Sequence, residues 1–156
     1  MKPIIGAQGE FVTLPACDAV VFYPQSYRGG WSVKIDQAKY LYEDGIESDD
    51  LAVLDYYATR EAAEMALIRA KALQRLKVLA YGDGWLPDLN DDSVEDKFGI
   101  YYSTFSGDFV VCGTLDMDNT FGIYFEAGDK AETALKSLTI QEREAFLYIH
   151  KPTEGK

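Results

Sequence analysis

The segment from residue 59 to residue 79 constrains the fold most strongly, because it is apolar around most of the circumference of a helix. Its apolar residues form two stripes at helical spacing: Met65, Ile68, Ala72, Leu76 and Leu79 in one, and Ala63, Ala66, Leu67, Ala70 and Leu73 in the other. Such a helix is normally covered on more than one side. We therefore expect a long central helix that is either sandwiched between layers or covered by a second subunit in a homodimer.

The sequence also marks both ends of this helix. Thr59 is a typical N-cap residue, and Glu61 and Glu64 follow it in the first turns, where the helix dipole favours negative charge. Gly82 is a typical residue for the C-terminal end. We therefore predict a helix that begins at Thr59 and stops near Gly82.

Strand and turn signals flank this helix and define the fold class. Five short strands are predicted before it, at residues 11–14, 18–23, 31–35, 39–42 and 51–57, with Pro24 ending the second. A three-stranded meander is predicted after it, followed by two short helices: 98–104, 109–115, 121–126, then 129–138 and 140–149. Thr139 and Glu142 form a capping box at the start of the last helix. We expect an α+β fold of two β-β-β-α repeats, with antiparallel sheets packed on the long central helix and two short C-terminal helices.

The repeat rests on an ungapped alignment of the two strand-to-helix junctions. Residues 56–67 align with residues 124–135 with five identical positions, and Tyr57 is replaced by Phe125. We expect a single domain over residues 1–156, divided as follows: an internal repeat at about 31–80 and 97–138, an acidic connector at 83–96 and a C-terminal helix at 140–149. The alternative is that any strand-to-helix junction combines aromatic, cap, acidic and alanine residues.

The same junctions resemble small proteins encoded by phages and prophages. One shared element is an aromatic strand end followed by an acid-x-Ala-Glu-x-Ala helix start, which is present twice, at residues 57–66 and 125–134. The other is a Trp-x-Pro-Asp connector at residues 85–88. The likeness spans residues 31–147, and its second copy departs from the pattern at Ala127 and Gly128, where a cap hydroxyl is expected. The resemblance transfers no catalytic residues. It implies a phage accessory protein made in the cytoplasm of a bacterial host.

The charge balance excludes several classes of partner. The chain has 15 Lys and Arg against 26 Asp and Glu, so its net charge is −11. A surface this negative repels phosphate groups, and we expect no direct binding of nucleic acid or of anionic membranes. The longest apolar streak, at residues 19–23, is far shorter than a membrane span, and no secretory leader is evident. We therefore expect a cytoplasmic protein whose macromolecular partners are basic.

Few residues are suited to catalysis or to holding a cofactor. Cys17 and Cys112 lie beside apolar residues and are expected to be reduced core thiols, and His150 is the only histidine. Asp88, Asn90 and Asp92 are spaced like the start of a calcium loop, but Ser93 and Gly99 stand where that loop needs its Gly and its Glu. We therefore expect no catalytic residues, no metal and no cofactor.

The acids are gathered in stretches that contain no basic residue. One stretch lies between Lys39 and Arg60 and another between Lys77 and Lys97. Both acidic loops should be exposed, because unpaired carboxylates are costly to bury. The candidate interaction surface consists of their acids and one tryptophan: Glu43, Asp44, Glu47, Asp49, Asp50, Trp85, Asp88, Asp91, Asp92, Glu95 and Asp96. The simpler alternative is an acidic surface that only keeps the protein in solution.

These observations favour a protein that acts by binding rather than by catalysis. We expect a non-enzymatic inhibitor of a bacterial defence protein, which docks an acidic, Tyr-rich surface on a basic site. One alternative is a protein that sequesters a nucleotide signalling molecule. Another is a small enzyme that uses surface carboxylates.

Overall fold

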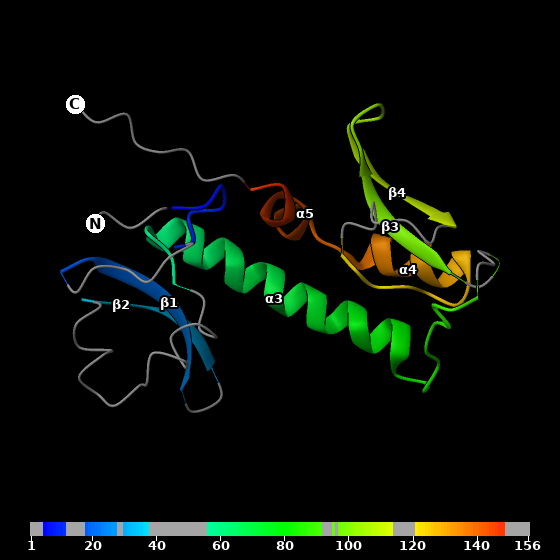
Figure 1. The fold of residues 1–156 in the computed structure, drawn as a ribbon, viewed down its shortest axis with the longest axis horizontal. Helices are drawn as coiled ribbons and strands as arrows, with labels where there is room; N and C mark the ends of the chain where they lie inside the picture. Colours follow the sequence, from blue (N-terminus) through cyan, green and yellow to red (C-terminus); the bar gives the residue numbers. More distant parts are fainter. Residues whose placement is uncertain are drawn as a thin grey trace. The chain divides into compact units, whose positions relative to one another are not determined.

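The computed structural model of the protein describes residues 5–11, 18–27, 30–37, 56–91, 95, 97–113 and 121–148. Within these residues it is a mixed α+β structure with three helices and two antiparallel two-stranded sheets. The chain divides into two compact units: unit 1 comprises Met1–Arg69 and Glu144–Lys156, and unit 2 comprises Ala70–Arg143. Helix α3 (Arg60–Tyr81) is one continuous helix that contributes residues to both units (Figure 1). The predicted α+β class and long helix are therefore confirmed.

Unit 1 is built on a hairpin of strand β1 (Val20–Tyr27) and strand β2 (Gly30–Gln37). The prediction that Pro24 ends the strand at residues 18–23 was wrong, because β1 continues through it. Phe22 exchanges two backbone hydrogen bonds with Tyr57, of 2.9 and 2.8 Å, on the side of β1 away from β2. Backbone groups alternate sides along a strand, so Pro24 faces the same side as Phe22. Its missing N–H therefore removes no bond from the β1–β2 ladder.

Small residues at the start of α3 form the core of unit 1. Ala62, Ala63 and Ala66 are buried together with Tyr57, and Phe22, Val33 and Tyr148 pack against this cluster. The hydroxyl of Thr59 accepts a hydrogen bond of 3.2 Å from the backbone N–H of Ala62, which confirms Thr59 as the N-cap.

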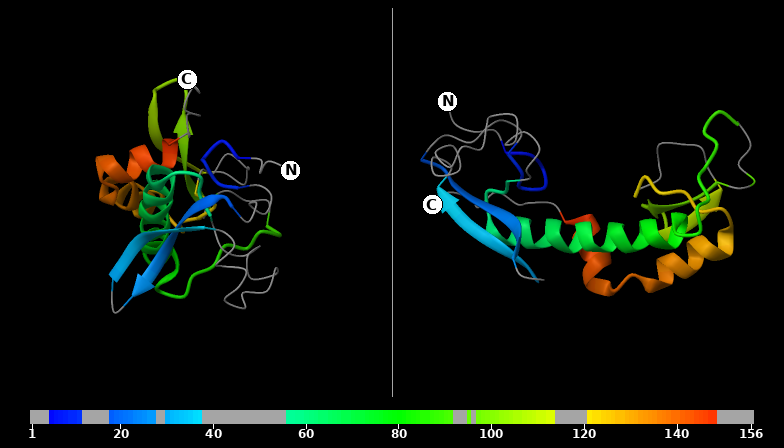
Figure 2. Two further views of the ribbon diagram at one scale, coloured as in Figure 1. Left: turned by 90° about the vertical axis from the view of Figure 1, so that its left-hand side faces the viewer. Right: turned by 90° about the horizontal axis from the view of Figure 1, so that it is seen from below.

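Unit 2 contains a second hairpin, formed by strand β3 (Phe98–Ser103) and strand β4 (Asp108–Gly113). Phe125 exchanges backbone hydrogen bonds with Phe98, of 2.9 and 2.8 Å, and the chain then enters helix α4 (Gly128–Ser137). Helix α4 lies against the hairpin (Figure 2). The rings of Phe109 and Phe121 stack on each other, with 5.5 Å between centroids.

Helix α5 (Ile140–Leu147) begins with the predicted capping box. The backbone N–H of Thr139 donates to the Glu142 carboxylate at 2.9 Å, and the N–H of Glu142 donates to the Thr139 hydroxyl at 3.1 Å. The same carboxylate binds the guanidinium of Arg75 at 2.7 Å. Hydrogen bonding to Arg75, above all, lowers the pKa of Glu142. The capping box is therefore confirmed, and it is reinforced by an ion pair to α3.

The two units share one local geometry at their strand-to-helix junctions. Tyr57 and Phe125 each pair with the first strand of a hairpin, and the following helix starts three positions later, at Arg60 and at Gly128. Alanines are buried six and nine positions after each aromatic residue, in two matching pairs: Ala63 with Ala131, and Ala66 with Ala134. The pairing partner in unit 1 is Phe22, which precedes residue 31, where the predicted repeat begins.

The long helix buries different residues in the two units. Its first turns bury Ala62, Ala63 and Ala66, and its second half buries Ala72, Leu76 and Ala80, which are spaced four apart. The apolar residues Val78 and Leu79 near its C-terminal end are exposed, at 62% and 45%. None of the helices in the described residues is long and apolar enough to span a membrane.

Candidate functional site

The structure describes four of the eleven predicted surface residues, all in the segment after α3. Trp85 is half-buried, and Asp88, Asp91 and Glu95 are exposed, as predicted for the acids. The other seven lie outside the described residues: Glu43, Asp44, Glu47, Asp49, Asp50, Asp92 and Asp96. From here on, the connector means residues 83–91, the described first part of the predicted acidic connector 83–96, and it is the candidate site.

The connector starts at a helix end that is fixed by backbone geometry. The N–H of Gly82 donates to the Val78 carbonyl at 2.9 Å, and a Cβ atom at Gly82 would lie only 2.4 Å from that oxygen. Gly84 has a φ of +90°, a left-handed conformation that favours glycine. The indole of Trp85 then stacks on the ring of Tyr81, with 6.3 Å between centroids and 22° between planes. The helix therefore ends near Gly82, as predicted.

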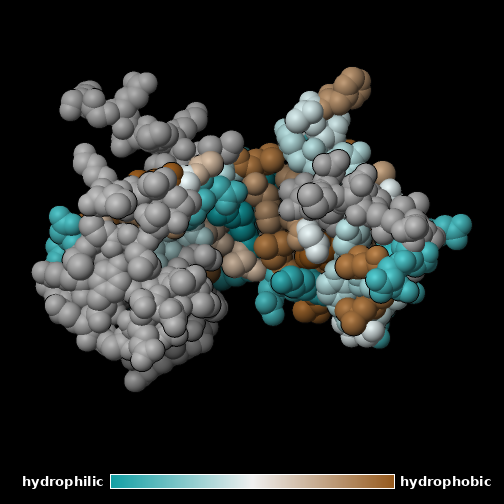
Figure 3. Space-filling model, in the orientation of Figure 1, coloured by the Kyte–Doolittle hydropathy of each residue, from teal (hydrophilic) through white to brown (hydrophobic). Residues whose placement is uncertain are grey.

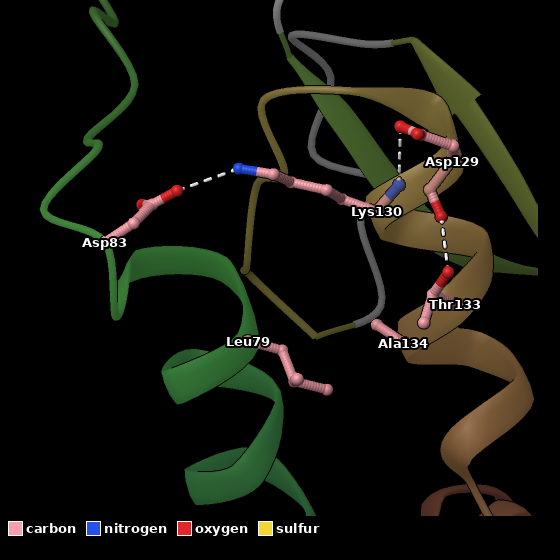
Figure 4. A pocket seen from close by; sticks show the side chains of 6 residues that line it. All are labelled: Leu79, Asp83, Asp129, Lys130, Thr133 and Ala134. Atoms are coloured by element: carbon pink, nitrogen blue, oxygen red, sulfur yellow. Dashed lines mark hydrogen bonds and ion pairs between the residues drawn. The ribbon is translucent and has the colours of Figure 1, made fainter.

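An ion pair holds the first residue of the connector. The ammonium of Lys130 donates to the Asp83 carboxylate at 2.9 Å (Figure 4). It also donates to the Glu126 carboxylate at 2.8 Å. The bond from Lys130 lowers the pKa of Asp83, and the backbone N–H of Trp85 lowers it further. The bonds to Glu126 and Asp83 raise the pKa of Lys130. Asp83 is therefore charged at neutral pH and tethered to α4.

A second lysine lies at the far end of the connector. The side chain of Lys97 is fully buried, and its ammonium lies 3.8 Å from the Asp91 carboxylate, which is 55% exposed. A buried ammonium is costly unless carboxylates or other acceptors surround it. A buried positive charge therefore lies beside the acidic segment. In the sequence analysis Lys97 served only as the end of an acidic stretch. Its place immediately before the apolar strand Phe98–Ser103 is the signal that points to burial.

The middle of the connector exposes two large apolar side chains that the sequence reasoning missed. Leu86 is 72% exposed and Leu89 is 64% exposed. Asp88 lies between them, and its carboxylate accepts a hydrogen bond of 2.9 Å from the backbone N–H of Asn90. The signal was available, since no helical or strand periodicity assigns these two leucines to a core.

The described tyrosines contribute mainly to the interior. Tyr56 and Tyr57 are buried, and Tyr23 meets Tyr56 edge-to-face at 5.8 Å. Tyr102 meets Phe109 in the same way, at 5.4 Å. Every tyrosine whose burial the structure describes is buried or half-buried, so the described part of the chain presents no fully exposed tyrosine.

An open pocket of about 240 Å³ adjoins the start of the connector, lined by Leu79, Asp83, Asp129, Lys130, Thr133 and Ala134 (Figure 4). Its polar groups largely satisfy one another. The Thr133 hydroxyl donates to the backbone oxygen of Asp129 at 2.8 Å, and Lys130 is already bound by two carboxylates. The pocket therefore offers no uncompensated cation to a phosphate group, which does not favour the nucleotide alternative.

Other reactive groups are sparse in the part of the chain that the structure describes. The Cys112 thiol is exposed on β4, so the prediction that it is a core thiol was wrong, while Cys17 and His150 lie outside the described residues. Among the described residues no group of three or more His, Cys, Asp or Glu side chains is arranged to hold a metal ion. No family model, curated protein or solved structure shows a significant match to the chain.

Proposed function

We propose that this protein acts by binding, and that its acidic connector docks on a basic site of a partner protein. The observation that supports this proposal is the exposure of Asp88, Asp91 and Glu95 in one segment of a chain whose net charge is −11. Such a surface attracts a basic partner at long range and rejects acidic ones.

The resemblance to phage and prophage proteins indicates the kind of partner. On that basis we propose an accessory protein that inhibits a bacterial protein in the host cytoplasm. A defence nuclease is the best-motivated target, because its nucleic-acid groove is basic and would accept a negative segment in place of phosphates.

The test compares two variants that each remove two negative charges. D88N/E95Q neutralises the acids at and just beyond the connector, and the amide oxygen introduced at position 88 keeps the acceptor for the Asn90 N–H. The control, E64Q/E144Q, neutralises two exposed acids elsewhere. The immobilised proteins are exposed to bacterial lysate, and the captured protein is eluted with a salt gradient. We expect D88N/E95Q to release the partner at lower salt and to weaken binding about three- to tenfold, because exposed charges contribute modestly and are screened.

The control should bind like the wild type. If both variants lose the same binding affinity, the effect comes from the net charge of the protein and not from the connector. Failure of the wild type to retain any protein would overturn the proposed function.

A further inference from the structure

Exposed apolar side chains are concentrated around the connector. Four of the large hydrophobic residues that are exposed in the described parts of the chain fall within residues 78–89: Val78, Leu79, Leu86 and Leu89. Figure 3 shows brown, hydrophobic side chains beside teal, hydrophilic ones on this part of the molecule. Single exposed leucines are common, but two of them on one acidic segment form an amphipathic surface.

The connector is held at both ends, and the two exposed leucines lie between these points. Asp83 is bound by Lys130 at one end, where Trp85 also stacks on Tyr81, and Asp91 lies beside Lys97 at the other. Residues 85–88 form no helix or strand. Pro87 fixes its own φ and has no N–H, which stiffens the chain between the two leucines. A segment that is already ordered loses little conformational entropy on binding.

From these features we infer that Leu86 and Leu89 are the anchors by which the connector docks. Their site on the partner protein is an apolar cleft whose rim carries Lys or Arg side chains that pair with Asp88 and Asp91. This inference rests on the proposed function and names the chemistry of its partner. Buried apolar anchors supply most of the affinity of such contacts. The charges at the rim raise the association rate and determine which partner is accepted.

The charge of the segment decides against a second copy of the chain as the occupant. Two connectors packed on each other would bring Asp88 of one copy close to Asp88 of the other, between two chains that each have a net charge of −11. Like charges placed together at an interface oppose association. A basic rim around an apolar cleft complements both features of the connector at once.

The test uses the partner protein that the wild type captures from lysate, purified and titrated calorimetrically. L86A/L89A removes the two anchors, and I140A/L147A removes two exposed aliphatic side chains from α5 as a matched control. We expect L86A/L89A to weaken binding about 10- to 100-fold at all salt concentrations, from the loss of two buried leucines. I140A/L147A and the apolar variant L86M/L89M should bind like the wild type. Circular dichroism and thermal melting establish that every variant is folded.

The possible outcomes separate this inference from the proposed function. If D88N/E95Q weakens binding while L86A/L89A does not, the anchors are wrong and the acidic docking surface stands. If neither variant weakens binding, or if no protein is captured, both proposals fail. If light scattering shows a dimer of the wild type that L86A/L89A dissociates, the occupant is a second copy and the inference is overturned.

Discussion

Asp88 and Asp91 are both exposed acids of the connector, but their carboxylates have different roles. Asp88 binds a nearby backbone N–H, at 2.9 Å, whereas Asp91 lies 3.8 Å from the buried ammonium of Lys97. Removing a carboxylate beside a buried cation weakens the compensation of that charge. The same substitution at Asp88 leaves no buried charge behind.

This difference predicts unequal effects of two matched amide substitutions on stability. Asp91→Asn should lower the free energy of unfolding by about 1–2 kcal/mol, because it weakens the compensation of Lys97. Asp88→Asn should change it by less than about 0.5 kcal/mol, since its amide oxygen preserves the local hydrogen bond. Urea unfolding of the two variants and the wild type measures both values. Equal effects would show that Asp91 does not stabilise the buried lysine.

Sequence reasoning found the acids of the site but not their surroundings. The exposure of Asp88 and Asp91 was predictable, because unpaired carboxylates are costly to bury anywhere. The burial of Lys97 was only suggested by the apolar strand that follows it, since the acceptors that compensate a buried ammonium are supplied by tertiary structure. The exposure of Leu86 and Leu89 was also missed, because composition favours a core position for leucine and the absence of a helical or strand pattern around them was not used.

At the scale of elements, the starts of α3 and α4 differ in one interaction. Thr59 caps α3 through its hydroxyl, whereas Ala127, at the corresponding position of α4, offers no side-chain cap. Ala127 has an extended backbone, with φ −142° and ψ 151°, which is the conformation of an N-cap residue. A hydroxyl at this position would reach the N–H groups of Asp129 and Lys130, of which the second already donates to the Asp129 carboxylate at 2.9 Å.

Two opposite substitutions test this comparison. Thr59→Ala should lower the free energy of unfolding by about 1 kcal/mol, and Ala127→Ser should raise it by about 0.5–1 kcal/mol. Thermal and urea unfolding measure both changes, and circular dichroism checks that helix content is preserved. A destabilising effect of Ala127→Ser would mean that the two junctions are not equivalent in geometry.

Local signals explain why the helices were predicted more accurately than the strands. Thr59, Gly82 and the capping box at Thr139 act within a few residues of each helix end, so the sequence alone identifies them. β1 can continue through Pro24 because the backbone nitrogen of Pro24 lies on the side of the strand away from β2. On that side Phe22 pairs with Tyr57, which is distant in the sequence. Such pairing is invisible to any local pattern.

At the scale of the whole molecule, one helix supplies buried residues to two compact units. Its apolar circumference predicted a sandwiched helix or a homodimer, and the structure buries one set of α3 residues in unit 1 and another in unit 2. The matching spacing at Tyr57 and Phe125 supports our proposal that the units arose by duplication of a strand–helix element. The connector lies wholly within unit 2, and no matching segment after α4 is found among the described residues.

Hydrogen exchange of the protein with and without its purified partner tests the central claim most directly. The account predicts that the amides of residues 84–90, which lie outside regular secondary structure, become protected on binding. The β3–β4 hairpin and the start of α3 should exchange at unchanged rates. Unchanged exchange in residues 84–90, with protection confined to other parts of the chain, would contradict docking through the connector.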